Sequence, residues 1–300
     1  MIAQKTPTVA ILGLGTMGLQ MALCLAEITT VRCFDVSDER MALARESGLQ
    51  SFNTAIETAR SSEVVLLVVR DGEQLNQVLF GDNGVAAVLS PGSVVMVAST
   101  VGIKVVRDIA ERLEKFGIEI VDSPLSGGPA RARLGDLLIV IGAAPKSLAK
   151  VQSLVDQLGS TVSVVGDKPG DGQALKTVNQ LLCGVHIAAA GEALALAQSL
   201  GLDLPRTLAA LNEGAAASFM LADRGARMLE IVSNGSTDVL SRIDIFVKDL
   251  GIVTATSRSM KTPTPVAAAA HQLFMLASAQ GLGELDDSSV MQLLLRQSAT

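Results

Sequence analysis

The chain has 300 residues, about twice the length of a typical domain, so two domains are expected. Hydrophobic residues make up 49% and charged residues 18%, which is typical of a compact globular protein and excludes a disordered chain. The net charge of −6 and the lack of a basic stripe argue against nucleic acid or an anionic membrane as partners. Met1–Thr8 shows no signal-peptide pattern, and the chain contains no uninterrupted apolar run of about 18 residues. Its three cysteines are too widely spaced for a disulfide framework, so a cytoplasmic protein is expected.

Residue types that the chain lacks exclude several kinds of chemistry. Tyr and Trp are absent, which excludes an alcohol dehydrogenase with a Tyr general acid. His186 and His271 both lie in helical-looking stretches, which argues against a His–Asp dehydrogenase. There is no Cys/His ligand cluster, so no metal is expected, and no G-x-S-x-G hydrolase motif. Lys and carboxylates therefore remain as the acid/base candidates.

The first half of the chain alternates short β-rich runs with helical segments. The expected strands are Val9–Leu12, Val31–Asp35, Glu63–Val69, Ser93–Ala98, Ile118–Val121, Leu137–Ile141 and Thr161–Val165. Helices are expected near 17–28, 38–47, 102–116 and 146–158, the second of them capped by Ser37 and ended by Gly48. Apolar runs that alternate with helices predict an α/β fold of the Rossmann type, with a doubly wound, mainly parallel sheet.

Strand signals stop after Gly170. Residues 171–200 indicate one long helix that is apolar on nearly every side, so we expect it to be buried between other elements. Further helices are expected near 205–212, 218–232, 238–260 and 264–280. The pattern predicts an α/β domain over residues 1–167 and an all-helical C-terminal domain over residues 168–300.

The first expected strand leads directly into a glycine-rich motif, G-x-G-x-x-G, made of Gly13, Leu14, Gly15, Thr16, Met17 and Gly18. These glycines permit a tight turn, close approach of a pyrophosphate and close helix–strand packing, and the following helix presents its amides to the phosphates. Asp35 ends the next strand, near the expected distance of about 20 residues. The motif predicts a dinucleotide site; the alternative is a glycine turn that serves packing alone.

Asp35 also bears on the choice of dinucleotide. A carboxylate at this position accepts hydrogen bonds from the adenosine ribose and repels a 2′-phosphate. Val36 and Ser37 supply no cation for that phosphate, although Arg40 is close in the sequence. NAD is therefore expected in preference to NADP.

Two polar residues share one face near the start of the apolar helix. Lys176 and Asn179 are three residues apart, and desolvation on such a helix would lower the pKa of Lys176. A lysine of this kind could take a hydroxyl proton while hydride leaves the same carbon. The alternative is that Lys176 extends to solvent from the helix end. His186 and His271 are interpreted as core histidines.

Two further segments carry candidate binding groups. Asp122–Pro129 follows a strand, and its glycines and Ser126 could hold a carboxylate, although an ordinary turn would look the same. Lys248 and Asp249 form a charged pair on a partly apolar helix, for which the alternative is a solvated face.

These pieces, in this order, resemble the β-hydroxyacid dehydrogenase family, which includes 3-hydroxyisobutyrate dehydrogenase and tartronate semialdehyde reductase. The resemblance covers most of the chain and runs through Gly13–Gly18, Ser99-Thr100, Asp122–Gly128, Gly170–Asn179 and Lys248–Gly251. It implies a catalytic lysine at Lys176 and a hydroxyl-binding amide at Asn179 or Gln180, where many relatives have two Asn. The substrate carboxylate is expected to bind at Ser126, Gly127, Gly128 and Lys248. The cofactor is expected to contact Thr100, Lys248, Val69 and Arg70.

Relatives often have Leu-Pro where Val69-Arg70 stands here, so Arg70 could reach either the cofactor or a more polar substrate. Three stretches are similar to the L-threonate dehydrogenase branch of the family, namely 78–81, 179–190 and 244–251. The branch implies oxidation of a short sugar acid, L-threonate, to its 2-oxo acid. The alternatives are a 3-hydroxyisobutyrate dehydrogenase, a tartronate semialdehyde (2-hydroxy-3-oxopropionate) reductase, an imine reductase, or a dinucleotide-binding scaffold without activity. The family fold further implies that nicotinamide binds between the domains and that a homodimer or homotetramer forms through the helical domain.

Overall fold

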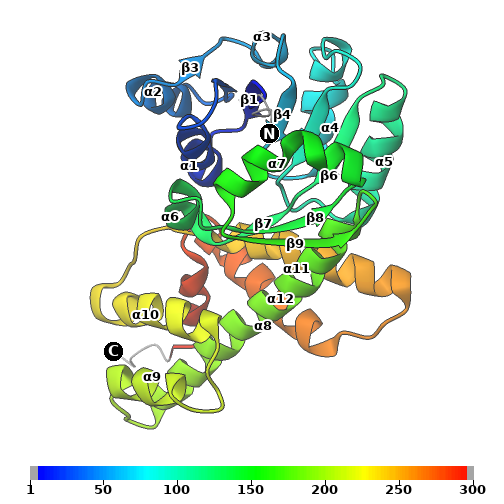
Figure 1. Ribbon diagram of the computed structural model, residues 1–300. Helices are drawn as coiled ribbons and strands as arrows, with labels where there is room; N and C mark the ends of the chain where they lie inside the picture. Colours follow the sequence, from blue (N-terminus) through cyan, green and yellow to red (C-terminus); the bar gives the residue numbers. More distant parts are fainter. Residues whose placement is uncertain (1–5, 296–300) are drawn as a thin grey trace. The chain divides into compact units, whose positions relative to one another are not determined.

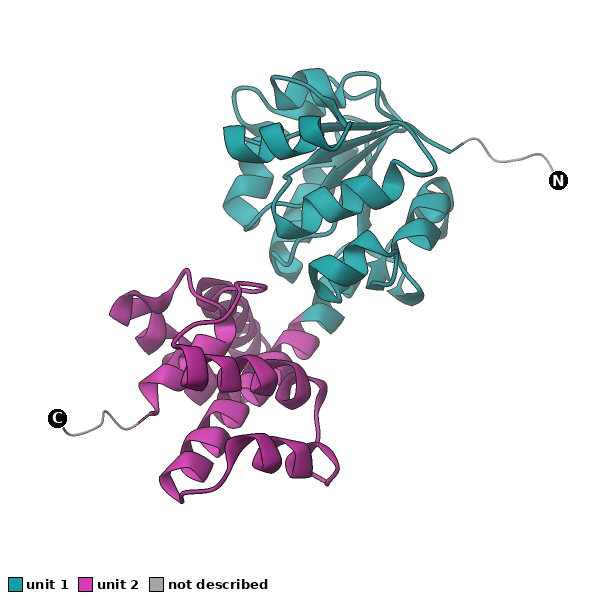
Figure 2. Ribbon diagram, turned by 90° about the vertical axis from the view of Figure 1, so that its left-hand side faces the viewer, with its two compact units in different colours: residues 1–176 teal, residues 177–300 magenta. Residues whose placement is uncertain are grey.

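The computed structural model describes residues 6–295, and the chain divides into two compact units, residues 1–176 and 177–300 (Figure 2). The first unit contains a sheet with helices, whereas the elements that lie wholly in the second are helical (Figure 1). This confirms the predicted fold class, a Rossmann-type α/β unit followed by an all-helical one.

The sheet of the first unit has nine strands within the described residues, in the order β3-β2-β1-β4-β5-β6-β8-β7, with β9 paired to β8. The strands are β1 (Val9–Leu12), β2 (Val31–Phe34), β3 (Gln50–Ser51), β4 (Val64–Leu67), β5 (Val94–Val97), β6 (Glu119–Asp122), β7 (Leu125–Ser126), β8 (Leu138–Gly142) and β9 (Thr161–Gly166). Strands β1 to β6 are parallel, and β8 runs antiparallel to β6 and β7.

The helices of this unit follow the strands in chain order. They are α1 (Thr16–Leu25), α2 (Asp38–Glu46), α3 (Ala55–Ala59), α4 (Gly72–Phe80), the 3₁₀ turn η1 (Val85–Ala87), α5 (Ile103–Glu114), α6 (Gly128–Arg133) and α7 (Pro145–Leu158). Val9 and Ile11 of β1 pack with the side chains of α1, α2 and α7, while Ala10 and Leu12 pack with those of α3, α4 and α5. Because alternate residues face opposite sides of a sheet, this strand must be apolar throughout.

The carboxyl ends of four neighbouring strands are aligned. Leu12 pairs with Leu67, Leu67 with Val97, and Val97 with Asp122. Because these strands are parallel and end in register, the loops that follow them meet at one edge of the sheet. Ligands of doubly wound sheets bind at that edge.

The helical unit is built around α8 (Asp171–Ser199), which begins in the first unit and continues into the second. The other elements are α9 (Leu204–Asn212), α10 (Phe219–Asn234), α11 (Ile243–Met260), α12 (Pro265–Ala277), the π-turn η2 (Ser278–Leu282) and the 3₁₀ turn η3 (Asp287–Leu293). Ile187 and Leu194 of α8 are fully buried in its core, where the rings of Phe246 and Phe274 stack with centroids 5.2 Å apart. Buried ion pairs, Arg224–Asp287 and Arg227–Asp286, join α10 to the segment around η3.

The expectation that α8 is buried on all sides is wrong for the single chain. Val178 and Leu182 are 57% and 49% exposed, because the packed helices contact the opposite stripe of α8. By length and composition α8 could cross a membrane, but half of its most apolar window is buried inside the protein. Helices in the core of folded proteins commonly have this composition.

Several predicted boundaries also shift, each for a local reason. The strand expected to reach Val69 ends at Leu67, because the amide of Val69 turns to the hydroxyl of Ser99. The helix expected from residue 238 begins at Ile243, because the amides of Leu240 and Ser241 donate to Asp286. The short elements α3, α4, α6, β3 and β7 were not expected.

Candidate active site

The glycine-rich loop after β1 is shaped by contacts that only glycine allows. Gly13 has φ +100°, and a Cβ on it would lie 2.3 Å from the carbonyl oxygen of Val68. A Cβ on Gly18 would lie 2.0 Å from the carbonyl oxygen of Gly13. Around Gly15, by contrast, nothing lies within 4 Å of such a Cβ, so the protein leaves this backbone open to a ligand.

The helix that follows the loop can receive an anion. The N-cap of α1 is Gly15, no side chain caps it, and its first turn holds no acidic residue. The helix thus presents its first amides and the positive end of its dipole beside the open glycine. Thr16 and Met17 belong to this first turn, and Leu14 is buried beneath the loop. These residues fit a dinucleotide pyrophosphate.

Asp35 connects the glycine loop to a hollow at the end of β2. Its carboxylate accepts from the amide of Leu14 at 2.6 Å and from the amide of Ser37 at 2.8 Å. A carboxylate has about four acceptor positions, so capacity remains for a ribose hydroxyl. The hollow, of about 300 Å³, is lined by Phe34, Asp35, Val36, Asp38, Met41, Arg45, Phe52 and Asn53.

This hollow contains charged groups that the sequence interpretation did not include. Asp38 adds a second carboxylate, and Arg45, in the last turn of α2, supplies a cation in place of Arg40, which does not line the hollow. The hollow thus carries two acidic side chains and one basic side chain.

The loops after β4 and β5 are hydrogen-bonded to each other. The amide of Val69 donates to the Oγ of Ser99 at 2.8 Å, which places Val69 next to the segment that carries Thr100. Arg70 behaves differently: its side chain is 62% exposed and pairs with Asp71 at 3.4 Å. The structure therefore does not tie the Arg70 guanidinium to the other expected site residues of this unit.

Lys176 lies near the same edge of the sheet. The start of α8 is held at the carboxyl end of β6, because the amides of Gly170 and Gln173 both donate to Oδ2 of Asp122 at 2.9 Å. Lys176 is one helical turn beyond Gln173 and is only 7% exposed. The alternative in which it extends into solvent is wrong.

The loop expected to hold a carboxylate follows β6. Ser126 is the last residue of β7 and pairs with Leu138 of β8. Gly127 and Gly128 have φ values of +144° and +77°, and nothing lies within 4 Å of a Cβ placed on Gly128. The backbone at Gly128 is therefore accessible, as an anion-binding turn requires.

In the helical unit, a chain of polar contacts connects the other expected residues. Asn179 donates to Oε1 of Gln180 at 2.8 Å, and Gln180 donates to Oδ2 of Asp249 at 2.5 Å. The Nζ of Lys248 lies 2.8 Å from Oδ1 of Asp249. Asp249 is 3% exposed, so the reading of this pair as a solvated face is wrong. Asp249 orients both Gln180 and Lys248, a role that the sequence did not reveal because it depends on a contact between α8 and α11.

Other candidate groups do not join these clusters. The ring of His271 contacts the carbonyl oxygen of Val247 at 3.0 Å, as a satisfied helix-packing residue does. Residues 6–295 contain no group of three His, Cys, Asp or Glu side chains that could hold a metal ion.

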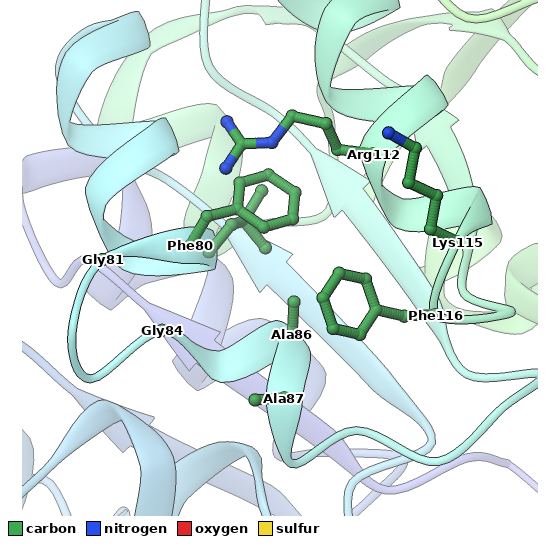
Figure 3. A pocket seen from close by; sticks show the side chains of 9 residues that line it. Phe80, Gly81, Gly84, Ala86, Ala87, Arg112, Lys115 and Phe116 are labelled. Carbon is green, nitrogen blue, oxygen red and sulfur yellow. The ribbon is translucent and has the colours of Figure 1, made fainter.

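Figure 3 shows a second hollow, of about 260 Å³. Its lining includes Phe80 and Phe116, with the guanidinium of Arg112 stacked 3.7 Å from the Phe80 ring. These residues lie where α4 and α5 end, in segments that lead to the amino ends of β5 and β6. None of the expected site residues lines this hollow.

The buried Asp122 generates a pH prediction. Burial raises the pKa of Asp122 to about 6, although hydrogen bonds from Gln173 and Gly170 act to lower it. A carboxyl with a raised pKa in the folded state contributes stability that is lost as the pH rises through about 6. On lowering the pH from 8 to 5, the free energy of unfolding of the wild type should rise relative to that of Asp122→Asn, by on the order of 1 kcal/mol. Denaturant titrations of both proteins measure this difference, and a difference that is flat with pH would contradict it.

Comparison with known proteins identifies the family of the whole chain. Residues 8–166 match the family model described as the NAD binding domain of 6-phosphogluconate dehydrogenase. Residues 170–294 match the model described as the NAD-binding domain of NADP-dependent 3-hydroxyisobutyrate dehydrogenase.

Individual relatives align over nearly their full length. The chain is 36% identical to an L-threonate dehydrogenase of Pectobacterium atrosepticum, over 95% of this chain and 93% of the relative. It is 32% identical to a 2-hydroxy-3-oxopropionate reductase of Escherichia coli K12, over 94% and 95%. A crystal structure of a 3-hydroxyisobutyrate dehydrogenase from Salmonella typhimurium superposes with a TM-score of 0.88 at 34% identity, covering 95% of this chain and 99% of that one. The chain belongs to the 3-hydroxyisobutyrate dehydrogenase-like family of NAD-dependent β-hydroxyacid dehydrogenases.

Proposed function

We propose that this chain oxidises L-threonate to its 2-oxo acid, with Lys176 as the general base. The observation that carries the mechanism is Lys176 itself, a lysine that is only 7% exposed, on a helix anchored at the carboxyl edge of the dinucleotide-binding sheet. The substrate is supported by five relatives named L-threonate dehydrogenase, which are 34–36% identical over 95% of this chain.

The chain's own residues divide the work of the reaction. Lys176 accepts the proton of the substrate hydroxyl, and Asn179, on the same face of α8, holds that oxygen together with Gln180. The backbone of Gly127 and Gly128, the hydroxyl of Ser126 and the ammonium of Lys248 bind the carboxylate, which fixes the carbon that reacts. Bound NAD supplies the acceptor for the hydride that leaves this carbon.

The cofactor is proposed to be NAD and not NADP. Gly13 to Gly18 and the start of α1 would bind its pyrophosphate, and Asp35 its adenosine ribose. Thr100 and the backbone of Val69 would approach the nicotinamide half of the cofactor, and Lys248 would lie on the side of the nicotinamide that faces the substrate. Arg70, whose side chain is exposed, would make at most a peripheral contact with the cofactor. In this proposal residues 1–167 form the NAD-binding domain and residues 168–300 the substrate-binding and dimerisation domain.

Removing the amine of Lys176 tests the mechanism. Lys176→Ala should lower kcat for L-threonate by at least about 100-fold, because a positioned general base contributes roughly 10²–10⁴-fold. Binding of NAD should persist, since its cradle at Gly13–Gly18 is unchanged. Lys168→Ala, at an exposed lysine just before α8, is the matched control. Initial rates of NADH formation measure both variants, and near-normal turnover of Lys176→Ala would remove it from the mechanism.

The substrate is tested on the wild type with a panel of short hydroxyacids. L-Threonate should give the highest kcat/KM, above D-erythronate and 3-hydroxyisobutyrate. The panel also includes 2-hydroxy-3-oxopropionate, which is assayed in the reverse direction, as reduction by NADH. A preference for 3-hydroxyisobutyrate or 2-hydroxy-3-oxopropionate would replace L-threonate as the substrate within the same mechanism. If the protein had no activity with any compound of the panel, the proposed function would be overturned.

Cofactor preference gives a separate prediction. The wild type should use NAD better than NADP, and Asp35→Ala should reduce that preference at least about tenfold. The physical reason is that a hydrogen bond to a charged group contributes about 1.5–3 kcal/mol. Glu39→Ala, on α2 but outside the hollow, should leave the preference unchanged. The preference is measured as the ratio of kcat/KM with NAD to kcat/KM with NADP. A wild type that prefers NADP would contradict the assignment of NAD as the cofactor.

The chain is proposed to act as a cytoplasmic homodimer or homotetramer paired through the helical unit. Val178, Leu182 and Leu196 of α8 are 57%, 49% and 61% exposed, and a second copy would cover such an apolar stripe. Light scattering should give a mass of at least twice the 31.0 kDa of one chain. Leu196→Glu should shift the mass toward one chain, whereas Gln198→Glu on the same helix should not. A monomeric wild type would refute this assignment.

A further inference from the structure

Gln173, the third residue of α8, makes four hydrogen bonds from a fully buried amide. Its Oε1 accepts from the amides of Val101 and Gly102, both at 3.0 Å. Its Nε2 donates to the carbonyl oxygen of Ser99 at 3.0 Å and to Oδ1 of Asp122 at 2.9 Å. Two acceptor and two donor positions are the full capacity of an amide, and the two backbone amides fix which way it points.

These bonds join the loops that follow three neighbouring strands. Ser99 follows β5 and is bonded through its hydroxyl to Val69, which follows β4. Asp122 ends β6, and its second oxygen accepts from the amides of Gly170, just before α8, and of Gln173. The Gln173 side chain is therefore hydrogen-bonded both to the 99–102 loop and to Asp122.

The position of Gln173 gives this network a consequence for chemistry. Lys176 lies three residues further along α8, on the same face, one helical turn away. Thr100 lies between the two loop residues, Ser99 and Val101, that bond to Gln173. Any tilt of α8 or shift of the loop that changed the spacing between Lys176 and Thr100 would have to break buried hydrogen bonds, which is costly.

We propose that Gln173 is a positioning residue for the dehydrogenase reaction, which sets the Lys176 ammonium at a fixed distance from the loop that carries Thr100. The inference rests on the proposed function, in which Lys176 takes the hydroxyl proton. The base must face the hydroxyl oxygen that loses its proton while the cofactor faces the carbon that loses hydride, and a misplacement of about 1 Å can cost roughly 100-fold in rate. Asp122 supports the same placement by holding the start of α8.

Exchange of the two polar groups tests the proposal. Gln173→Glu keeps the size and the acceptor for Val101 and Gly102 but loses both donors and faces the Asp122 carboxylate. In the double variant Gln173→Glu/Asp122→Asn, the Asn amide can donate to Glu, so the pair is restored with its partners exchanged. Gln272→Glu makes the same chemical change at an exposed residue of α12 and is the control.

Gln173→Glu should lower kcat about 10- to 100-fold with little change in KM, while affinity for ADP-ribose, which occupies only the adenosine and pyrophosphate cradle, stays within about twofold. A new carboxylate one turn from Lys176 favours its ammonium form, so the rise of kcat/KM with pH should move to higher pH. The double variant should recover at least tenfold of the lost kcat. A purely structural role would lower the melting temperature and leave the kcat of the folded enzyme unchanged.

Each outcome decides between the claims. An active wild type with unchanged kcat and pH profile in Gln173→Glu would overturn the positioning role and leave the proposed function intact. A wild type inactive on every hydroxyacid would overturn the proposed function and this inference with it. If Gln173→Glu does not fold, Gln173→Met replaces it. The proposal then requires that the amides of Val101 and Gly102 exchange hydrogen faster than in the wild type and that kcat falls. Amides that remain protected from exchange would contradict the proposal.

Discussion

The alignment of four parallel strand ends is the constraint on which the rest of the first unit depends. Leu12, Leu67, Val97 and Asp122 lie in register, so the loops after β1, β4, β5 and β6 must share one edge of the sheet. The last of these strands ends in a buried carboxylate that accepts from the amides of Gly170 and Gln173, at the start of α8. The helix with the candidate base is thus fixed to the same edge that carries the dinucleotide motif.

Much of this arrangement could be predicted from the sequence, for a physical reason. Strands covered on both faces must be apolar at every position, so runs such as Val9–Leu12 stand out. The glycine motif could also be predicted, because its G-x-G-x-x-G spacing directly after an apolar run is a local pattern. The structure adds the reason for two of its glycines: Gly18 lies against the carbonyl of Gly13, and Gly13 lies against the carbonyl of Val68 after β4. Short helices such as α3 and α6 were missed, since five or six residues cannot show a helical period.

The parts of the site that escaped prediction all depend on contacts between residues far apart in the sequence. The sequence indicated Asp249 only as part of a charged pair with Lys248, and its contact with Gln180 emerged only from the packing of α11 against α8. Gln173 was one polar residue in an apolar helix until the structure gave it partners at Ser99, Val101 and Asp122. Similarly, no pattern within α8 indicated that Val178 and Leu182 would remain exposed in the single chain, because that depends on which stripe the neighbouring helices cover.

The central claim is that Lys176 takes the proton of the substrate hydroxyl, and a crystal structure of the complex with NAD and L-threonate tests it most directly. The account predicts that Nζ of Lys176 lies about 2.6–3.2 Å from the hydroxyl oxygen on the carbon that faces the nicotinamide. A bound substrate whose reacting hydroxyl contacts another acid or base, with Lys176 beyond hydrogen-bond reach even through one water, would contradict the account.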